Sequence, residues 1–386
     1  MNRDLLSGEY KRFPKHWDVI LFTKAFKDMT GGQTKIPKGD YLESGDIPII
    51  DQGQDLIGGY TNERQAVCDI RLPCVVFGDH TKIFKFVTKP FALGADGVKV
   101  LSEANNIDPK FAYYFLNTLN LPNVGYSRHF RFLKRTFFPL PPLEEQRRIA
   151  AILDKADGVR RKRKEAIRLT EELLKSTFLE MFGDPVTNPK GWEIVKLGSL
   201  VVGQLNNGIF KKNHEYGGDT PVVWVKELFS GYTIDCSESR TLTPTDEEVK
   251  KFGLTKGDIL FCRSSLNREG IGFNNVFDGM DFSALFECHI IRVSLNQRKV
   301  NSIFLNYLLR FPGLRKQIIA KANTVTMSTI GQSEIKKIEF YLPPKELQDK
   351  FEIFLRKIAT NRTKLENKES ENLFNSLLQR AFRGEL

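Results

Sequence analysis

The residues best suited to chemistry form polar clusters in which basic side chains stand among aromatic ones. One cluster occupies positions 126–137, which read Tyr-Ser-Arg-His-Phe-Arg-Phe-Leu-Lys-Arg-Thr-Phe. Lysine and arginine neutralise phosphates, and arginine and histidine reach base edges, so this mixture is typical of a strip that contacts nucleic acid. Its candidate contact residues are Arg128, His129, Arg131, Lys134 and Arg135.

A second polar cluster comes directly after the strand-like run at residues 74–77. It consists of His80, Thr81, Lys82 and Lys85. The second half of the chain offers counterparts at corresponding positions, which are basic or hydroxyl-bearing: Lys211, Lys212, Arg263, Ser264, Arg268, Thr324, Thr326 and Thr329. For any single lysine, the competing interpretation is a solvated surface charge.

The usual catalytic signatures do not accompany these clusters. The sequence has no GxGxxG or GxxxxGK[ST] phosphate loop and no GxSxG elbow. Glu334-Ile-Lys336 has the carboxylate and lysine of a nuclease site, but the second carboxylate that such a site needs is not nearby in the sequence. The five cysteines form no CxxC pair, and the five histidines have no HxH or HExxH spacing. We therefore predict no catalytic residues and no metal site.

The composition predicts a soluble protein with a polyanionic partner. A chain of 386 residues with 41% hydrophobic and 27% charged residues is long enough for two or three globular domains. No run approaches the roughly 18 apolar residues that span a bilayer, and residues 1–13 lack an apolar signal core, so we expect a cytoplasmic protein. The net charge of +11 is spread along the chain, which favours a folded binding surface over a basic tail.

The elements that must position these clusters occur twice. Pro14–Ile20 recurs as Pro189–Val195, and the strand-like run at 75–77 recurs at 259–261. Three more pairs of segments follow in the same order: 111–116 with 304–309, 138–146 with 340–348, and 173–182 with 373–382. Each half thus predicts a mixed globular unit, a Pro-Pro step and a long helix.

A long helix is predicted after each Pro-Pro step, Pro141-Pro142 and Pro343-Pro344, with apolar residues spread over 149–182 in the first and 351–382 in the second. Their apolar residues recur at close to 3.5-residue spacing, which is typical of coiled-coil seams. The first helix has 34 residues and would be about 50 Å long at 1.5 Å per residue. We predict that the two pair antiparallel about a pseudo-twofold axis. In the competing interpretation, each helix packs only on its own globular unit.

The globular units are predicted to be α/β in the broad, α+β sense. Short runs rich in β-branched and aromatic residues alternate with Gly/Asp turns, for example at 47–50, 83–87 and 221–225. One short helix per copy is expected at Pro109–Thr118 and at Ser302–Arg310. No βαβ series is regular enough to predict a parallel sheet.

Several segments resemble the specificity subunits of Type I restriction-modification systems. Residues 138–154, which begin Phe-Pro-Leu-Pro-Pro-Leu-Glu-Glu-Gln, resemble the entry to the central helix of that family. Residues 176–192 resemble the passage from that helix to the second recognition domain, and residues 377–386 resemble the family's C-terminus. Gly78–Thr81 with Phe91–Gly97 is similar to one class of these recognition domains.

The resemblance implies target recognition domains at 1–140 and 184–342, a central spacer helix at 141–183 and a C-terminal spacer helix at 343–386. It implies that the chain is not an enzyme. Instead it would read a bipartite, asymmetric target in double-stranded DNA in a prokaryotic cytoplasm. It would scaffold two methyltransferase subunits and the restriction–translocase subunits. S-adenosylmethionine, ATP and Mg²⁺ are expected on those partners, and no cofactor on this chain.

The chain departs from the family pattern at residues 126–137, where a Gly/Ser/Thr-rich loop is more usual; residues 322–330 are nearer to that pattern. Two other classes of function remain open. The first is a coiled-coil assembly scaffold without DNA reading, which retention of duplex oligonucleotides would exclude. The second is a self-contained nuclease or methyltransferase, which activity of the purified chain alone would identify.

Overall fold

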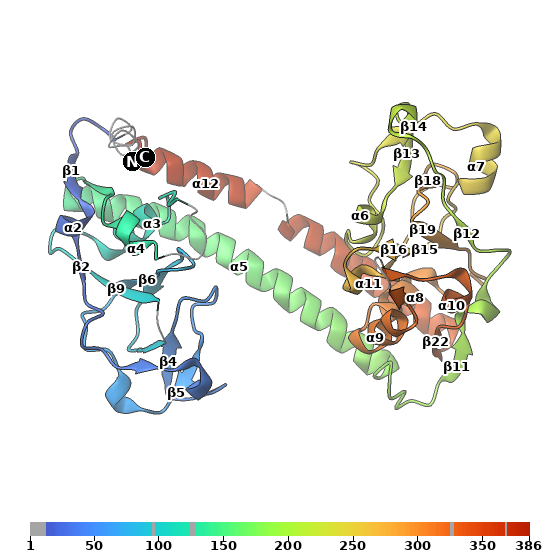
Figure 1. Ribbon diagram of the computed structural model, residues 1–386, viewed down its shortest axis with the longest axis horizontal. Helices are drawn as coiled ribbons and strands as arrows, with labels where there is room; N and C mark the ends of the chain where they lie inside the picture. Colours follow the sequence, from blue (N-terminus) through green and yellow to red (C-terminus); the bar gives the residue numbers. More distant parts are fainter. Residues whose placement is uncertain (1–12, 95–96, 123–127, 325–327, 367–368) are drawn as a thin grey trace. The chain divides into compact units, whose positions relative to one another are not determined.

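The computed structural model describes residues 13–94, 97–122, 128–324, 328–366 and 369–386. The chain divides into two compact units (Figure 1). The first combines Met1–Lys164 with Asn367–Leu386, and the second comprises Glu165–Glu366. Each unit therefore holds part of the central helix and part of the C-terminal helical region.

The first unit is built from short strands and helices. Their bounds are β1 (Asp18–Leu21), α2 (Phe22–Ala25), β2 (Phe26–Asp28), β3 (Lys35–Ile36), β4 (Ile47–Ile50), β5 (Gly59–Thr61), β6 (Cys74–Gly78), β7 (Phe84–Val87), β8 (Ala92–Gly94), β9 (Val98–Glu103), α3 (Pro109–Leu116), α4 (Phe130–Leu133) and β10 (Phe137–Leu140). One sheet has the strand order β2-β9-β6-β7, another has the order β3-β8-β4-β5, and β1 pairs with β10.

The second unit has more elements. Their bounds are β11 (Glu193–Lys196), β12 (Asn206–Asn207), β13 (Thr220–Val223), α6 (Val225–Leu228), β14 (Thr241–Leu242), α7 (Asp246–Phe252), β15 (Ile259–Cys262), β16 (Ser264–Ser265), β17 (Asn274–Val276), β18 (Leu285–Phe286), β19 (Ile290–Val293), α8 (Ser302–Leu309), α9 (Pro312–Ala320), β20 (Asn323–Thr324), β21 (Ser328–Thr329), α10 (Gln332–Lys336) and β22 (Glu339–Leu342). Its main sheet has the order β12-β19-β15-β17.

The repeat predicted from the sequence appears in the structure as the same pattern of strand pairing in both units. Strand β15 pairs antiparallel with β17 and β19, as β6 pairs with β7 and β9. The parallel pair β13–β18 corresponds to β4–β8, and β11–β22 corresponds to β1–β10. Among the described residues most strand pairs are antiparallel, and the parallel pairs are β3–β8, β4–β8 and β13–β18.

The long helical segments are α5 (Leu143–Phe182), α11 (Lys345–Glu366) and α12 (Glu369–Ala381). Helix α5 begins directly after Pro141-Pro142, the Pro-Pro step at which the first long helix was expected to start, because proline suits the first turn of a helix. Residues 367–368, in the middle of the second predicted helix, lie outside the described residues.

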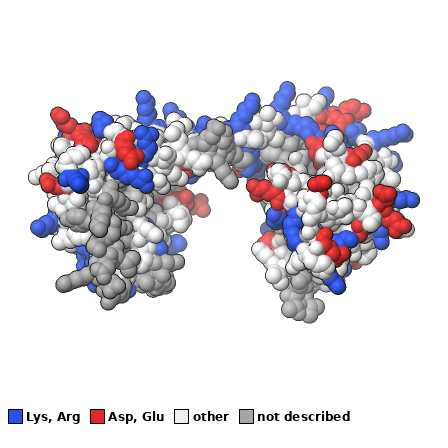
Figure 2. Space-filling view, turned by 90° about the horizontal axis from the view of Figure 1, so that it is seen from above, with Lys and Arg blue, Asp and Glu red and all other residues white. Residues whose placement is uncertain are grey.

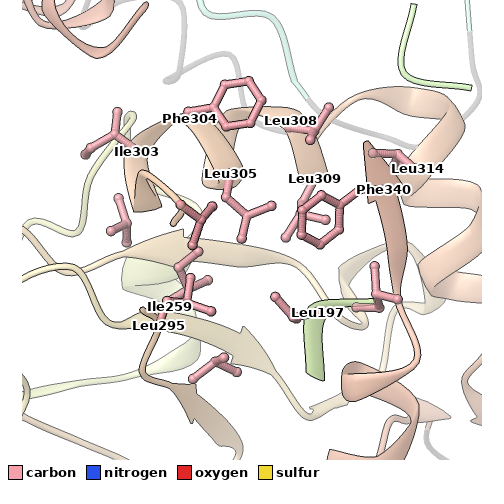
Figure 3. Packing of buried hydrophobic residues seen from close by; sticks show 14 of the residues in the cluster. Leu197, Ile259, Leu295, Ile303, Phe304, Leu305, Leu308, Leu309, Leu314 and Phe340 are labelled. Carbon is pink, nitrogen blue, oxygen red and sulfur yellow. The ribbon is translucent and has the colours of Figure 1, made fainter. Parts of the chain in front are cut away.

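Both units bury helical side chains in their cores. In the first unit, Leu153 of α5 and Phe374 of α12 join one core with Phe111 of α3. In the second unit, Phe178 of α5 and Phe351 of α11 join the core around α8. Figure 3 shows Leu305 and Leu309 of α8 packed near Phe340 of β22 and Leu197, which belong to other elements of that core.

Polar contacts link the same helical segments within each unit. In the first unit, Arg148 Nη2 donates to the Leu386 carbonyl at 2.7 Å, and Arg160 lies 3.6 Å from Glu371. In the second unit, Arg362 Nη1 lies 2.9 Å from Glu171 Oε1. The interpretation in which each helix packs only on its own globular unit is therefore wrong for α12, which packs in the first unit.

The predicted seam is only partly buried. Ile149, Leu153 and Leu174 are buried, whereas Val159 and Leu173 are half exposed. The buried positions are those that face a core. The spacing of apolar residues along α5 therefore reflects packing against the two cores near the ends of the helix more than a continuous coiled-coil seam. Within the described residues, no helix combines the length and the apolar character needed to cross a membrane.

A buried glutamine anchors each long helix to its unit. Gln146 Oε1 accepts the Asp108 N–H at 2.8 Å, and its amide donates to the Pro141 carbonyl at 2.8 Å. Gln348 repeats both contacts, with the Asn301 N–H at 2.8 Å and the Pro343 carbonyl at 2.7 Å. Asp108 and Asn301 are the N-caps of α3 and α8, so one side chain ties a short helix to a long one.

Candidate nucleic-acid interface

The first polar cluster is a tight turn between β6 and β7. The Gly78 N–H donates to the Ile83 carbonyl and the Lys82 N–H to the Gly78 carbonyl, each at 2.8 Å. Lys82 has φ +63°, and the exposed Thr81 donates its hydroxyl to the Gln52 carbonyl at 2.7 Å. A Cβ on Gly78 would lie 2.3 Å from Thr81 Oγ1, so this turn needs glycine there.

Three hydrogen bonds join this turn to the predicted contact strip. The Asp79 carbonyl accepts the His129 N–H and His129 Nδ1, both at 2.9 Å. Asp79 Oδ1 accepts the Phe130 N–H at 2.6 Å. Because a carbonyl only accepts, His129 Nδ1 carries its proton. Two clusters that are separate in the sequence are thus one surface feature, which we call the first-unit loop cluster (residues 79–82 and 128–135).

Aromatic rings hold the cations of this cluster at the surface. The Phe130 ring has Lys99 Nζ at 5.1 Å and Lys134 Nζ at 5.5 Å from its centroid, and Arg131 lies over Phe132 at 4.7 Å. Arg128, Arg131, Lys134 and Arg135 are exposed. Rings beneath cations reduce their freedom while leaving the charged groups available to phosphates.

Two predicted contact residues of the first unit lie inside it. Lys85 is 5% exposed and sits 3.4 Å from Asp51 Oδ1, while His129 is 1% exposed. Burial lowers the pKa of Lys85, against the opposing effect of Asp51. We revise both assignments from contact residues to residues that support the turn, because neither has surface to offer a ligand.

In the second unit, the counterparts meet in a small sheet with the order β16-β21-β20. The Arg263 N–H donates to the His289 carbonyl at 2.7 Å, and its carbonyl accepts the Ile330 N–H at 3.0 Å. Ser264 then pairs with Thr329. The side chain of Thr324 and all of Thr326 lie outside the described residues, although the backbone of Thr324 pairs with Ser328.

The connection from β15 to β17, residues 263–273, carries the remaining arginine. Arg268 is exposed at the start of a short 3₁₀ turn, where Asn267 Oδ1 accepts the Glu269 N–H. The neighbouring Leu266 is 88% exposed. We call residues 263–268 with 328–330 the second-unit loop cluster.

The two predicted lysines of the second unit have different surroundings. Lys211 Nζ lies 2.7 Å from Glu248 and 3.7 Å from Glu215, and its hydrogen bond to Glu248 raises its pKa. Its charge is thus already paired, which reduces what it can offer a phosphate. Lys212 is exposed. Figure 2 shows Lys and Arg side chains exposed on both units, interspersed with Asp and Glu.

Lys99 lies beside the first-unit loop cluster, over the ring of Phe130, but was not among the predicted contact residues. It lies on β9 between the buried residues Val98 and Val100, and it pairs with Asp28 at 2.8 Å. The alternation of buried and exposed positions in this strand is the signal that could have identified it.

The nuclease-like Glu334 and Lys336 lie on α10, and Glu334 pairs with Lys337 at 3.9 Å. Asp278, some fifty residues upstream, accepts two hydrogen bonds from Arg356 of α11, at 2.6 and 2.9 Å. Both carboxylates therefore take part in ion pairs.

A family model described as "Type I restriction modification DNA specificity domain" matches residues 23–169 and 189–374. The chain is similar to the Type I restriction enzyme MjaIX specificity subunit of Methanocaldococcus jannaschii, with 24% identity over 381 residues that cover 88% of this chain and 86% of that one. It is also similar to the MjaVIII specificity subunit of the same organism, with 25% identity over 396 residues, covering 94% and 90%.

Among solved structures, the chain resembles the S subunit of a Type I restriction-modification system from M. genitalium. The TM-score is 0.63 at 15% sequence identity, and the match covers 95% of this chain and 96% of that one. At this identity the likeness concerns the fold.

Proposed function

Because the chain belongs to the family of Type I restriction modification DNA specificity domains, we propose that it reads DNA for a Type I restriction-modification complex and catalyses no step itself. The observation that carries this proposal is the gathering of basic and hydroxyl residues, from separate segments, into one loop cluster per unit. In the first unit Asp79 joins the two segments, and in the second unit the pairing of Ser264 with Thr329 does so.

The target is an asymmetric double-stranded DNA sequence in two parts, one read by each unit. The two units share a frame, by which we mean the common strand pairing and the short helix packed on it, but they carry different loops. Different loops offer different hydrogen-bond donors and acceptors to base edges. A palindromic target would instead require two equal reading surfaces.

The helices form an antiparallel coiled-coil spacer that fixes the gap between the half-sites. In the first unit, Arg148 meets Leu386 whereas the later Arg160 meets the earlier Glu371, and this order supports antiparallel pairing. In the second unit, Glu171 meets Arg362 and the Phe178 ring lies 5.2 Å from the Phe351 ring, again in antiparallel order.

Lengthening the helices tests the spacer directly. Four residues inserted near Glu165 add about 6 Å and keep the helix face nearly in phase, and the same extension would be made in the second helix. We expect the same half-sites with one or two more unspecified base pairs between them, since 6 Å is a little under two steps of about 3.4 Å. An unchanged gap with efficient methylation would contradict the spacer.

The chain scaffolds two methyltransferase subunits and the restriction–translocase subunits, which carry S-adenosylmethionine, ATP and Mg²⁺. Exposed apolar side chains on the long helices support such docking, because they gain by burial against a partner. They are Val159, Leu169, Leu173, Ile353 and Leu373.

The experiment that tests the function is a methylation map of cells that express this chain with a partner methyltransferase. We expect one bipartite, asymmetric sequence to be methylated only when the chain is present. Methylation that does not depend on this chain would contradict the proposal. Failure to retain duplex DNA while the methyltransferase still binds would favour a scaffold without DNA reading.

A further inference from the structure

Three consecutive side chains with metal-ligating atoms meet in the second unit. Glu287, Cys288 and His289 lie between β18 and β19. Glu287 Oε2 is 2.8 Å from His289 Nδ1, and Cys288 Sγ is 3.6 Å from each of these atoms. A carboxylate, a thiol and an imidazole thus point at one position.

These distances fit the ligand shell of a tetrahedral zinc-class ion. Zinc bonds to sulfur at about 2.3 Å and to nitrogen or oxygen at about 2.0–2.2 Å, which at tetrahedral angles places ligand atoms roughly 3.3–3.6 Å apart. Both sulfur distances already have this value. Only the carboxylate–imidazole pair is closer, because a hydrogen bond now joins it, and an opening of about 0.6 Å replaces that bond by metal bonds.

The carboxylate also needs a positive partner. Glu287 is 2% exposed, and His289 is the one residue that forms an ion pair with it within the described part of the chain. Its other contacts are the His289 N–H at 2.9 Å and the thiol. A buried carboxylate without a compensating charge is costly, so a metal ion bound at this position would stabilise it.

The backbone around these residues is held firmly. The Glu287 N–H donates to the Val223 carbonyl at 3.0 Å, and its carbonyl accepts the Ile290 N–H at 3.1 Å. Gly208 packs so closely on this segment that a Cβ there would lie 2.1 Å from the Phe286 carbonyl. Such support preorganises ligands, since little freedom remains to be lost on binding.

We propose that Glu287, Cys288 and His289 bind one divalent transition-metal ion of the zinc class. His289 is exposed, which leaves the fourth position to water. In the sequence of the first unit, the corresponding residues after β8 are Ala95-Asp96-Gly97, which lack the thiol and the imidazole.

The ion would brace the second-unit loop cluster. Arg263, which lies between β15 and β16, donates its N–H to the carbonyl of His289, so a metal bound to that imidazole would fix the backbone where the loop cluster begins. This consequence, unlike the site itself, rests on the proposed function.

The test is a cobalt titration of the full-length reduced chain without DNA, followed by zinc competition against a chromophoric chelator. We expect one ion per chain and a thiolate-to-cobalt charge-transfer band that Cys288→Ser abolishes. His289→Asn and Glu287→Gln should each weaken zinc binding at least tenfold. Cys236→Ser and His214→Asn, which change a half-buried cysteine and an exposed histidine elsewhere in the same unit, should leave both readings unchanged.

A band that persists in Cys288→Ser, or cobalt binding without a thiolate band, would overturn the site. Circular dichroism of each variant identifies those that fail to fold, and the conservative Cys288→Ser change keeps the shape of the side chain while it replaces the sulfur by the smaller oxygen. Because the titration needs no DNA, a chain that reads DNA but shows no band overturns the metal site alone.

Discussion

The two units of this chain share a frame and differ in the loops placed on it. Gln146 and Gln348 make the same two contacts, one to a helix N-cap and one to a proline carbonyl. The connection that follows the central strand, in contrast, spans residues 79–83 in the first unit and 263–273 in the second. The first is a tight turn and the second contains a strand and a 3₁₀ turn.

This difference separates the residues that support the fold from those that we propose to read DNA. The shared parts are buried, and their hydrogen bonds are satisfied within the frame, so they tolerate little change. The differing parts are exposed and carry the arginines, so they can vary without loss of the fold. Under the proposed function, a change in the loops of one unit alone would change one half of the DNA target.

The largest expected effect comes from reversing charges in the first-unit loop cluster. Arg131→Glu, Lys134→Glu and Arg135→Glu together remove cations that we propose to face phosphates, and they add repulsion, so we expect roughly 100- to 1000-fold weaker DNA binding at low salt. Fluorescence anisotropy with the methylated sequence measures this effect. The slope of log affinity against log salt should become shallower by about one for each phosphate that the variant no longer neutralises.

A matched variant keeps this test specific. Lys15→Glu, Lys38→Glu and Arg64→Glu make the same change in net charge with exposed residues outside the cluster. If this control weakened binding as much as the cluster variant, binding would depend on overall charge and the assigned surface would be wrong.

The next effect tests the shared frame. Gln348→Ala leaves the Asn301 N–H and the Pro343 carbonyl buried without a partner, and each such group costs about 1–3 kcal/mol. We therefore expect the second unit to lose about 2–4 kcal/mol of its free energy of unfolding. Gln146→Ala should do the same to the first unit. Hydrogen exchange should show faster exchange in α8 for Gln348→Ala and in α3 for Gln146→Ala.

Arg147→Ala and Lys350→Ala, at exposed neighbouring positions, are the controls. Substitutions at such surface positions usually change the free energy of unfolding by no more than about 0.5 kcal/mol. Equal loosening of α3 and α8 by either glutamine variant would show that the two anchors do not act on separate units.

The smallest effect concerns how ions fix the helices. In the second unit, Arg356 of α11 forms an ion pair with Asp278. In the first unit, Asp154 of α5 forms an ion pair with Lys110, with 2.6 Å between Oδ1 and Nζ. Burial raises the pKa of Asp278, but the hydrogen bond and the charge of Arg356, together with the smaller effect of Lys256, bring it below its ordinary value of 3.8. Because both partners are partly exposed, we expect Arg356→Met to cost only about 0.5–1 kcal/mol at neutral pH.

The sign of the pH dependence follows from that lowered pKa. The stabilising effect is fully present above the unfolded-state pKa of Asp278 and is lost as pH falls through the folded-state value. Wild type and Arg356→Met should therefore differ in urea denaturation at pH 7 and converge below about pH 3.8. A difference that is unchanged in acid would show that the arginine acts through packing alone.

Much of the frame was predictable from the sequence, because its determinants are local or repeated. Asp108 and Asn301 precede the short helices as N-caps, and Pro141-Pro142 marks the start of α5. The packing of α12 in the first unit was not a local signal. It depends on Phe374 and Phe382 reaching a core formed by residues far away in the sequence.

The segments of the candidate interface were predictable from their amino-acid composition, but which of their side chains are exposed was less predictable. The segments around His80 and Arg131 were predictable from their residue types, but the role of Asp79 in joining them was not. Lys85 and His129 appear in the same polar runs as their exposed neighbours, and only the tertiary fold decides that they point inward. Lys99 was not predicted because it lies on a strand that is otherwise largely apolar.

The most direct test of two independent reading surfaces on a shared frame is a methylation map after domain exchange. Residues 1–140 are replaced by the first recognition domain of another family member, and the chain is expressed with its partner methyltransferase. We predict that one half of the methylated sequence changes while the other half and the gap between them stay the same. A change in both halves would contradict the separation of a shared frame from two independent reading surfaces.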